Sequence, residues 1–126
     1  FPATKHIGVM METGSEYFDL SYYNQPEEFL PVMLEVKTSA PFALKITAQA
    51  ACPWANTGEY VIVVPSADAG QGKLALVKTD GKYCIKKYFK YKDHIILEDK
   101  NKKQKRFKPA DIEVTGQILA FYRKPL

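Results

Sequence analysis

The feature that most constrains the fold is a pair of short apolar runs on either side of Thr79-Asp80-Gly81-Lys82. Residues 73–78 alternate polar and apolar side chains, and residues 83–91 form a second run that is rich in aromatic residues. An Asp-Gly pair between two such runs is a strong signal for a β-hairpin, because its tight turn needs residues that accept positive φ angles. The sequence therefore predicts a sheet built from short strands.

The rest of the chain indicates the same fold class. Gly116 in the last apolar run predicts a bulge or a close backbone approach. No stretch sustains the i, i+3, i+4 apolar spacing of a helix, so helix is expected to be scarce. Residues 1–30 show weak periodicity and are expected to form an arm with short strands at most. We predict one mostly β domain of strongly bent antiparallel sheets, with further strands at 31–36, 42–47, 59–65, 94–98 and 112–122.

The excess of positive over negative charge comes from one segment. The chain has 18 Lys/Arg against 14 Asp/Glu and a net charge of +4. Residues 82–108 hold eleven of these cations and three of the anions, and residues 100–108 alone hold six cations. The 100–108 loop either contacts phosphate groups or is a solvated hairpin tip whose like charges keep a sheet edge soluble. The lack of an aromatic platform favours the solvated tip.

Several classes of protein are disfavoured. No run of 18 apolar residues is present, so no membrane-spanning helix is predicted. The sequence begins Phe1-Pro2 without a basic-then-apolar leader, and we expect a trimmed fragment of a longer cytoplasmic protein. Cys52 and Cys84 lack a metal-binding spacing. They are expected to be buried or free thiols in a reducing compartment, with a disulfide as the alternative.

Metal and cofactor chemistry have little support. His6 and His94 are the only histidines in the sequence, and neither has a Cys or His at the short spacing of a metal site. The same shortage disfavours a Ser-His-Asp triad, and no glycine loop precedes a helix to bind phosphate. We therefore expect no metal and no cofactor.

A series of short motifs, in a fixed order, covers residues 46–122. It comprises Ile46 to Pro53, Asn56-Thr57-Gly58-Glu59, Ile85-Lys86-Lys87-Tyr88, Phe107-Lys108-Pro109 and Ile112 to Leu119. This order resembles the self-cleaving carboxy-terminal domain of LexA, UmuD and phage CI-type repressors. In that family a G-D-S-M-x-P turn, a D-G-D element, a V-K-[RK]-L strand, Y-x-P-I and I-x-G-x-V follow one another.

The resemblance implies a domain division and two site residues. Residues 31–126 would form the LexA-like β domain, and residues 1–30 an arm or linker that contains a vestigial cleavage region. In the family, the serine of the first motif attacks a peptide bond and the lysine of the third motif takes its proton. Counting back eight residues from Gly58 puts the serine position at Ala50, and Lys86 occupies the lysine position. Alanine has no atom to attack with, so the chain is expected to be inactive.

Two explanations for Ala50 stay open. An engineered serine-to-alanine change would trap an uncleaved form, whereas natural loss would leave a domain kept for association. Ala48, Gln49 and Ala51 also depart from the motif, which favours natural loss. A shift of two residues redirects the side chain, so Cys52 is a poor substitute nucleophile. Lys86 also has a structural interpretation, as a strand lysine with a packed stem and a solvated head.

The resemblance also implies a cleavage bond. Cleavage in the family falls at an Ala-Gly or Cys-Gly bond about 35 residues before the serine. Thr13-Gly14 is the candidate bond, because Gly14 lies 36 residues before Ala50. A simple turn glycine is the favoured alternative for Gly14.

The family's domain is a dimerising module joined to an amino-terminal helix-turn-helix that binds operator DNA. We therefore expect self-association, with an inducer or antirepressor protein as a further partner and no membrane. The last strand, with Ile118, Leu119, Ala120, Phe121 and Tyr122, is expected near the interface or in the core. Two alternatives remain. One is an autoprotease, triggered by a partner filament, whose serine has been removed; the other is a small nucleic-acid-binding barrel that uses the 100–108 loop.

Overall fold

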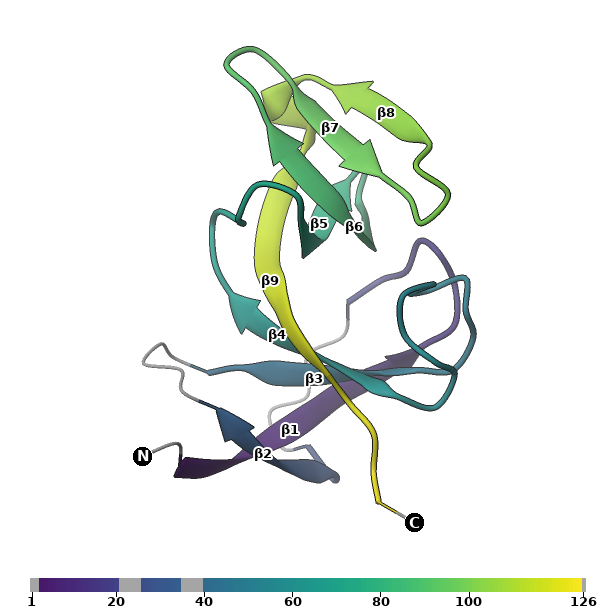
Figure 1. Ribbon diagram of the computed structural model, residues 1–126, viewed down its shortest axis with the longest axis vertical. Helices are drawn as coiled ribbons and strands as arrows, with labels where there is room; N and C mark the ends of the chain where they lie inside the picture. Colours follow the sequence, from purple (N-terminus) through teal and green to yellow (C-terminus); the bar gives the residue numbers. More distant parts are fainter. Residues whose placement is uncertain (1–2, 21–25, 35–39, 126) are drawn as a thin grey trace.

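The structure is a computed structural model that describes residues 3–20, 26–34 and 40–125 (Figure 1). It contains β1 (Ala3–Thr13), β2 (Phe29–Leu34), β3 (Phe42–Ile46), β4 (Tyr60–Pro65), β5 (Lys73–Thr79), β6 (Lys82–Lys90), β7 (Ile95–Glu98), β8 (Gln104–Phe107), the 3-10 helix η1 (Pro109–Asp111) and β9 (Glu113–Tyr122). The prediction of a mostly β chain with little helix is confirmed. Within the described ranges, no helix is long and apolar enough to cross a membrane.

The strands form one strongly bent sheet in the order β2-β1-β3-β4-β9-β5-β6-β7-β8. β9 pairs with β4 on one side and with β5 on the other, so this single strand joins the two halves of the molecule (Figure 1). The β1–β3 pair is parallel, whereas the other pairs are antiparallel. A mostly β fold of strongly bent antiparallel sheets was expected from the sequence, so this parallel pair is a difference.

The hairpin and the glycine signals are confirmed. Thr79 pairs with Lys82 across the β5–β6 turn. The two central residues have the positive φ angles that such a turn requires, 50° at Asp80 and 77° at Gly81. A Cβ atom at Gly116 would lie 2.7 Å from the backbone oxygen of Val64. Gly116 therefore allows the backbones of β9 and β4 to approach closely, as its position in the last apolar run predicted.

Two segments differ from the sequence prediction. The arm was expected to hold short strands at most, but β1 is 11 residues long and pairs with both β2 and β3. The charged 100–108 loop contains an edge strand, β8, which pairs with β7. The strand predicted at 31–36 begins at Phe29 instead, and its last two residues lie outside the described ranges. The other predicted strands are present to within about two residues.

Buried side chains form three clusters along the sheet. The first lies at the centre, where Leu44, Val61, Leu76 and Ile85 are almost completely buried. Cys52 belongs to this cluster and Cys84 to the third one, between β5, β6 and β7. Both thiols are free and fully buried, which confirms their predicted burial and removes the disulfide alternative.

The second cluster lies between the β1–β2 pair and β4. It consists of Ile7, Leu30, Val32, Ala43, Tyr60 and Ile62. Polar contacts close its edge: the Tyr60 hydroxyl donates a hydrogen bond to Glu28 over 2.8 Å, and Lys124 also contacts the Glu28 carboxylate. The hydrogen bond from Lys124 holds the pKa of Glu28 below its usual range. These contacts fix the end of the chain against the entry to β2.

Candidate functional site

Lys86 lies in the middle of β6, opposite Ala75 of β5. Alternation along the strand points its side chain to the same face as Cys84 and Tyr88, away from Ile85 in the first core cluster. The Lys86 side chain is only 14% exposed, and its Nζ atom lies 2.9 Å from the Glu16 carboxylate. The lysine is therefore a largely covered cation with a close acid partner.

The surroundings of Lys86 keep it protonated. Burial lowers the pKa of Lys86, but the hydrogen bond and the negative charge of Glu16 together outweigh burial, and the pKa lies above the ordinary lysine value. Burial also raises the pKa of the neighbouring Cys84 thiol to about 11. At neutral pH the Lys86 amine therefore carries its proton and cannot act as a base. The Cys84 thiol also carries its proton and is a weak nucleophile.

Ala50 lies in the turn that connects β3 to β4. The turn is held by backbone hydrogen bonds: Gly58 N–H donates to Ile46 O over 2.7 Å, and Ala51 N–H donates to Ala48 O over 3.2 Å. Ala51 and Cys52 are buried and anchor the turn on the first core cluster, whereas Ala50 itself is exposed. The turn therefore presents position 50 to the outside in a fixed conformation.

Ala50 and Lys86 line the same cavity, although they are 36 residues apart in the sequence. This cavity, called the site cavity below, has a volume of about 450 Å³. It is lined by Glu16, Gln49, Ala50, Pro53, Lys86, Asp99, Lys100 and Asn101. A second cavity of about 370 Å³ adjoins it and shares Glu16, Lys86 and Asp99. The fold thus brings the two predicted site positions to the lining of one cavity.

The site cavity also contains Gln49, which matters for the position of the missing serine. The eight-residue spacing falls on Ala50 when it is counted from Gly58, and on Gln49 when it is counted from the preceding residue, Thr57. Both side chains line the cavity with Lys86. Neither has a hydroxyl group, so the absence of a nucleophile does not depend on which count is used.

Thr13 and Gly14 lie beside the turn that contains Ala50. Thr13 is the last residue of β1, is 5% exposed, and its carbonyl accepts a hydrogen bond of 2.9 Å from Thr47 N–H. A Cβ atom at Gly14 would lie 2.7 Å from Thr47 Oγ1 and 3.4 Å from Ala48 Cβ. The close approach explains the glycine structurally, and it also places the candidate cleavage bond next to the turn.

Glu16 is the site residue that the sequence did not indicate. It is 70 residues from Lys86 and belongs to no motif that we recognised. It lines both cavities and contacts the lysine directly. Only the long-range pairing of the 16–19 segment with β6 brings it there, and local sequence gives no signal for such pairing.

Comparison with known families identifies the fold family of the chain. The Peptidase S24-like family model matches residues 6–119, which include most of β1, the turn at 47–58, Lys86 and most of β9. The chain belongs to the Peptidase S24-like family. The match begins in the segment that the sequence suggested was an arm, in agreement with the presence of β1 in the sheet.

Curated relatives of this S24-like domain are LexA repressors. The LexA repressor of Geobacillus kaustophilus is 33% identical over 67 residues, covering 52% of this chain and 32% of that protein. The LexA repressor of Leptospira interrogans is 28% identical over 100 residues (77% of this chain and 49% of that protein), and that of Clostridium botulinum is 25% identical over 96 residues (75% and 48%). The chain therefore spans less than half the length of the relatives that it matches.

The last strand of the S24-like domain has mixed exposure. Ile118 is buried in the first core cluster, and Ala120 and Tyr122 pack against the second. Leu119 and Phe121 are 43% and 41% exposed. Of the five residues predicted near an interface or in the core, three therefore contribute to core packing, and two present apolar surface to solvent.

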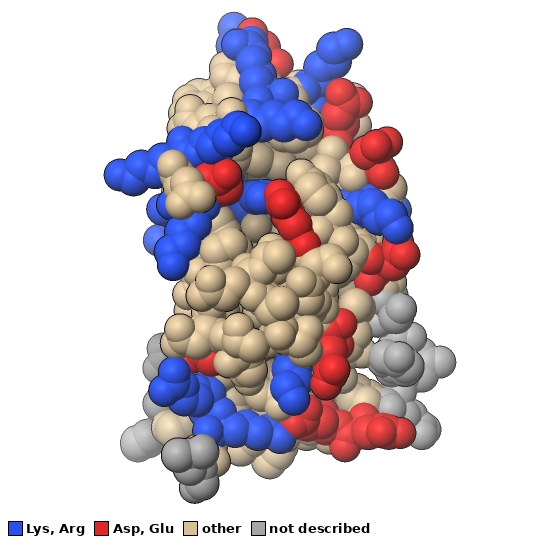
Figure 2. All heavy atoms as spheres, turned by 90° about the vertical axis from the view of Figure 1, so that its right-hand side faces the viewer, with Lys and Arg blue, Asp and Glu red and all other residues tan. Residues whose placement is uncertain are grey.

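The basic segment is divided between the site and one end of the S24-like domain. Lys86 lies in the site cavity, and Lys100 Nζ donates a hydrogen bond of 2.9 Å to the carbonyl oxygen of Pro53 on the cavity rim. Residues 100–106 are exposed, and Lys and Arg side chains gather at the end formed by β7 and β8 (Figure 2). Because β8 is the last strand in the sheet order, the placement agrees with the interpretation of a charged, solvated edge.

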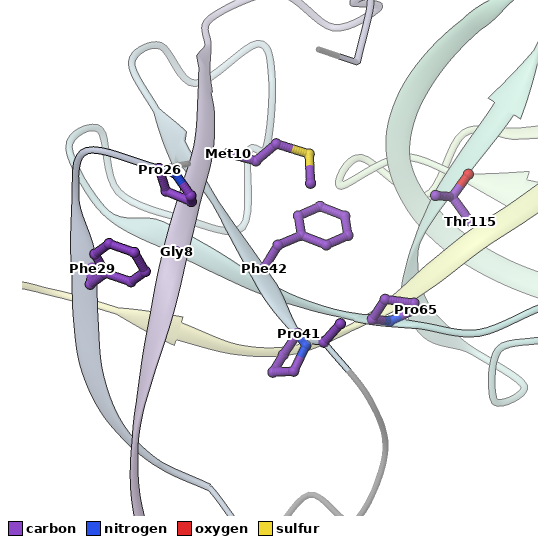
Figure 3. A pocket seen from close by; sticks show the side chains of 9 residues that line it. Gly8, Met10, Pro26, Phe29, Pro41, Phe42, Pro65 and Thr115 are labelled. Atoms are coloured by element: carbon purple, nitrogen blue, oxygen red, sulfur yellow. The ribbon is translucent and has the colours of Figure 1, made fainter. Parts of the chain in front are cut away.

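A third cavity of the S24-like domain has a different character. It has a volume of about 440 Å³ and lies between the middle of β1, the entry to β3 and the end of β4. Met10 and Phe42 point into it, with Pro65 and Thr115 on the far side (Figure 3). None of its nine lining residues is charged, so it offers no acid, base or ligand for a metal. Across the described ranges, no three His, Cys, Asp or Glu side chains are arranged to hold a metal ion.

Proposed function

We propose that this S24-like domain is the self-association domain of a LexA-type repressor and that it has no peptidase activity. The composition of the site cavity is the main support. Lys86 lines the cavity, but none of the eight lining residues has a hydroxyl or a thiol. A Ser-Lys mechanism needs a hydroxyl to attack the carbonyl and a neutral lysine to take its proton. Without the first group, the lysine has nothing to activate.

The nearest thiol does not replace the serine. Cys52 is fully buried in the first core cluster and does not line the site cavity. Burial raises the pKa of this thiol, so it carries even less thiolate than an ordinary cysteine. A Cys-Lys pair built on Cys52 is therefore not part of the proposal.

Self-association is supported by the similarity to LexA repressors and by the exposed part of β9. Leu119 and Phe121 form an apolar surface at the end of a strand whose other side is packed in the core. In the proposal, this surface pairs two copies in the cytoplasm. An amino-terminal helix-turn-helix would bind operator DNA, and coupling two such heads raises their effective concentration on paired half-sites. An inducer or antirepressor protein would control the assembly.

Replacing both exposed residues, Leu119→Ser and Phe121→Ser, is expected to weaken association of the domain at least about tenfold, because apolar area is lost from the interface. Sedimentation velocity over a concentration series measures the effect. Tyr91→Ser is the control, since Tyr91 is 47% exposed but follows β6, which is separated from β9 by β5 in the sheet order. A wild-type domain that stays monomeric, or a double variant that associates unchanged, would refute this part of the proposal.

The second candidate is a Ser-Lys autoprotease whose serine has been removed. The observation in its favour is that Ala50, Gln49 and Lys86 share one cavity, with Thr13-Gly14 beside the same turn. This candidate predicts that returning a serine to the turn restores self-cleavage near Gly14. The self-association proposal predicts an intact chain.

A third candidate, a nucleic-acid-binding module, is favoured by the exposed cations at the β7–β8 end (Figure 2). Phosphate contacts release counterions, so such binding would weaken steeply as salt is raised. Titration of the domain with duplex and single-stranded DNA at low salt tests this candidate. No binding at low salt removes it.

A further inference from the structure

The segment that follows β1 is docked along the first half of β6. Its contacts follow an antiparallel register, in which Asp19 meets Lys82 and Phe18 meets Tyr83. Phe18 N–H donates to Tyr83 O over 3.0 Å, and Tyr83 N–H donates to Phe18 O over 2.8 Å. Glu16 also contacts β6, at Lys86, one residue off this register. Residues 16–19, called the docked segment below, therefore lie along β6 and are joined to it by a single β-bridge at Phe18.

The docked segment is attached by more than its charges. Phe18 is 7% exposed, belongs to the first core cluster, and stacks on the ring of Tyr83 with 6.5 Å between ring centroids. β7 pairs with β6 only from Lys87 onward, so the docked segment occupies the part of this edge that β7 leaves uncovered. Phe18 would thus hold the segment in place even if Glu16 lost its charge.

Glu16 is the acid that contacts Lys86. The other charged groups around the two cavities come from the β7–β8 turn and β8: Asp99, Lys100, Lys103 and Lys105. The Asp99 carboxylate is held locally, because the backbone N–H groups of Asn101 and Lys103 each donate a hydrogen bond of 2.9 Å to its Oδ1 atom. The three lysines repel a positive charge on Lys86. Tyr17 and Cys84 are neutral at pH 7, and burial raises the pKa of each further. The charge of Lys86 is therefore matched chiefly by Glu16.

We propose that Glu16 is a built-in blocker of Lys86: its carboxylate keeps the lysine as an ammonium group and covers it from the side of the docked segment. An ammonium group that donates to a carboxylate has no lone pair with which to accept a proton from a nucleophile. The blocker is a barrier to peptidase chemistry that is separate from the missing hydroxyl. The assignment of Lys86 as a site residue rests on the proposed function. The contact between Glu16 and Lys86, and its effect on the protonation of Lys86, do not.

The test measures how fast Lys86 reacts with acetic anhydride. Only the neutral amine form of a lysine attacks this reagent. Glu16→Gln keeps the shape of the side chain and removes the charge, so acetylation of Lys86 at pH 8 is expected to rise about tenfold. The rate profile should also shift toward lower pH by about one unit. Tandem mass spectrometry separates Lys86 from Lys87, whose side chain points to the other face and serves as the internal reference.

Two controls distinguish the blocker from a general loosening of the domain. Glu12→Gln removes a charge from the preceding strand, where the carboxylate lies 3.8 Å from Lys45, and should leave Lys86 unchanged. Asp19→Asn removes the other ion pair of the docked segment but keeps Glu16, and should also leave the pH profile of Lys86 unchanged. Equal acetylation of Lys86 in wild type and Glu16→Gln overturns the proposal, and so does an equal rise in Asp19→Asn. Neither readout requires cleavage, so failure here is distinct from failure of the proposed function.

Discussion

Leu44→Ala is expected to lower the free energy of unfolding of the domain by about 2–5 kcal/mol, the range for a leucine truncated in a packed core. Leu44 is 0% exposed and lies on β3, between Met11 of β1 and Val61 of β4. It belongs to the first core cluster, on which the turn containing Ala50 is anchored. Truncation leaves a cavity where three strands meet, and rigid neighbours can fill it only in part.

Urea unfolding followed by the fluorescence of Trp54 measures this loss, since Trp54 packs against the same cluster. The matched control is Met33→Ala, which removes a side chain of similar size that is 65% exposed. The control is expected to change the free energy of unfolding by no more than about 0.5 kcal/mol. Equal losses in the two variants would show that the first cluster is not the main core.

Gly116→Ala is the second large expected effect. The added Cβ would lie 2.7 Å from both Val63 Cγ1 and the Val64 oxygen, and the oxygen belongs to backbone that cannot rotate away. Gly116 pairs with Pro65 of β4 and with Leu76 of β5, so relief of the clash must displace the strand that joins both halves. Overpacking of this kind costs about 1–3 kcal/mol.

Thermal unfolding of Gly116→Ala against Gly70→Ala tests this expectation. Gly70 lies in an exposed turn, and a Cβ there would meet the Lys73 side chain, which can move. The midpoint is expected to fall by several degrees for Gly116→Ala and to change little for Gly70→Ala. An unchanged midpoint for Gly116→Ala would mean that β4 and β9 separate at no cost.

The strands found from sequence are those with local signals. β5 and β6 are joined by an Asp-Gly turn, and the apolar run of β4 ends at a proline, so short stretches of sequence suffice to identify them. β1 was missed because its partners, β2 and β3, come from residues 29–34 and 42–46, and its pairing depends on contacts that no local pattern encodes. β8 was missed because its residues are mostly exposed and lack apolar alternation.

The candidate site shows the same limit. The ordered motifs identified Lys86 and the turn near Ala50, and the structure brings both to one cavity. The roles assigned to these residues, and to Thr13-Gly14, stay predictions. Glu16 could not be found, because its effect on Lys86 arises from a docked segment that is distant in sequence. A charge that alters the state of a site residue is visible only after the chain has folded.

The most direct test of the central claim, that this S24-like domain serves association and is not a peptidase disabled only by loss of its serine, is to return the serine. Ala50→Ser and Gln49→Ser are each combined with Glu16→Gln, so that the Glu16–Lys86 pair cannot by itself explain an intact chain. The proteins are incubated at alkaline pH, where more of Lys86 is neutral, and their intact masses are followed. We predict a single uncleaved mass, because the Thr13 carbonyl is buried and bonded to Thr47 N–H at the end of β1. Cleavage near Gly14 that disappears in a Lys86→Ala version of the same variant would contradict the account.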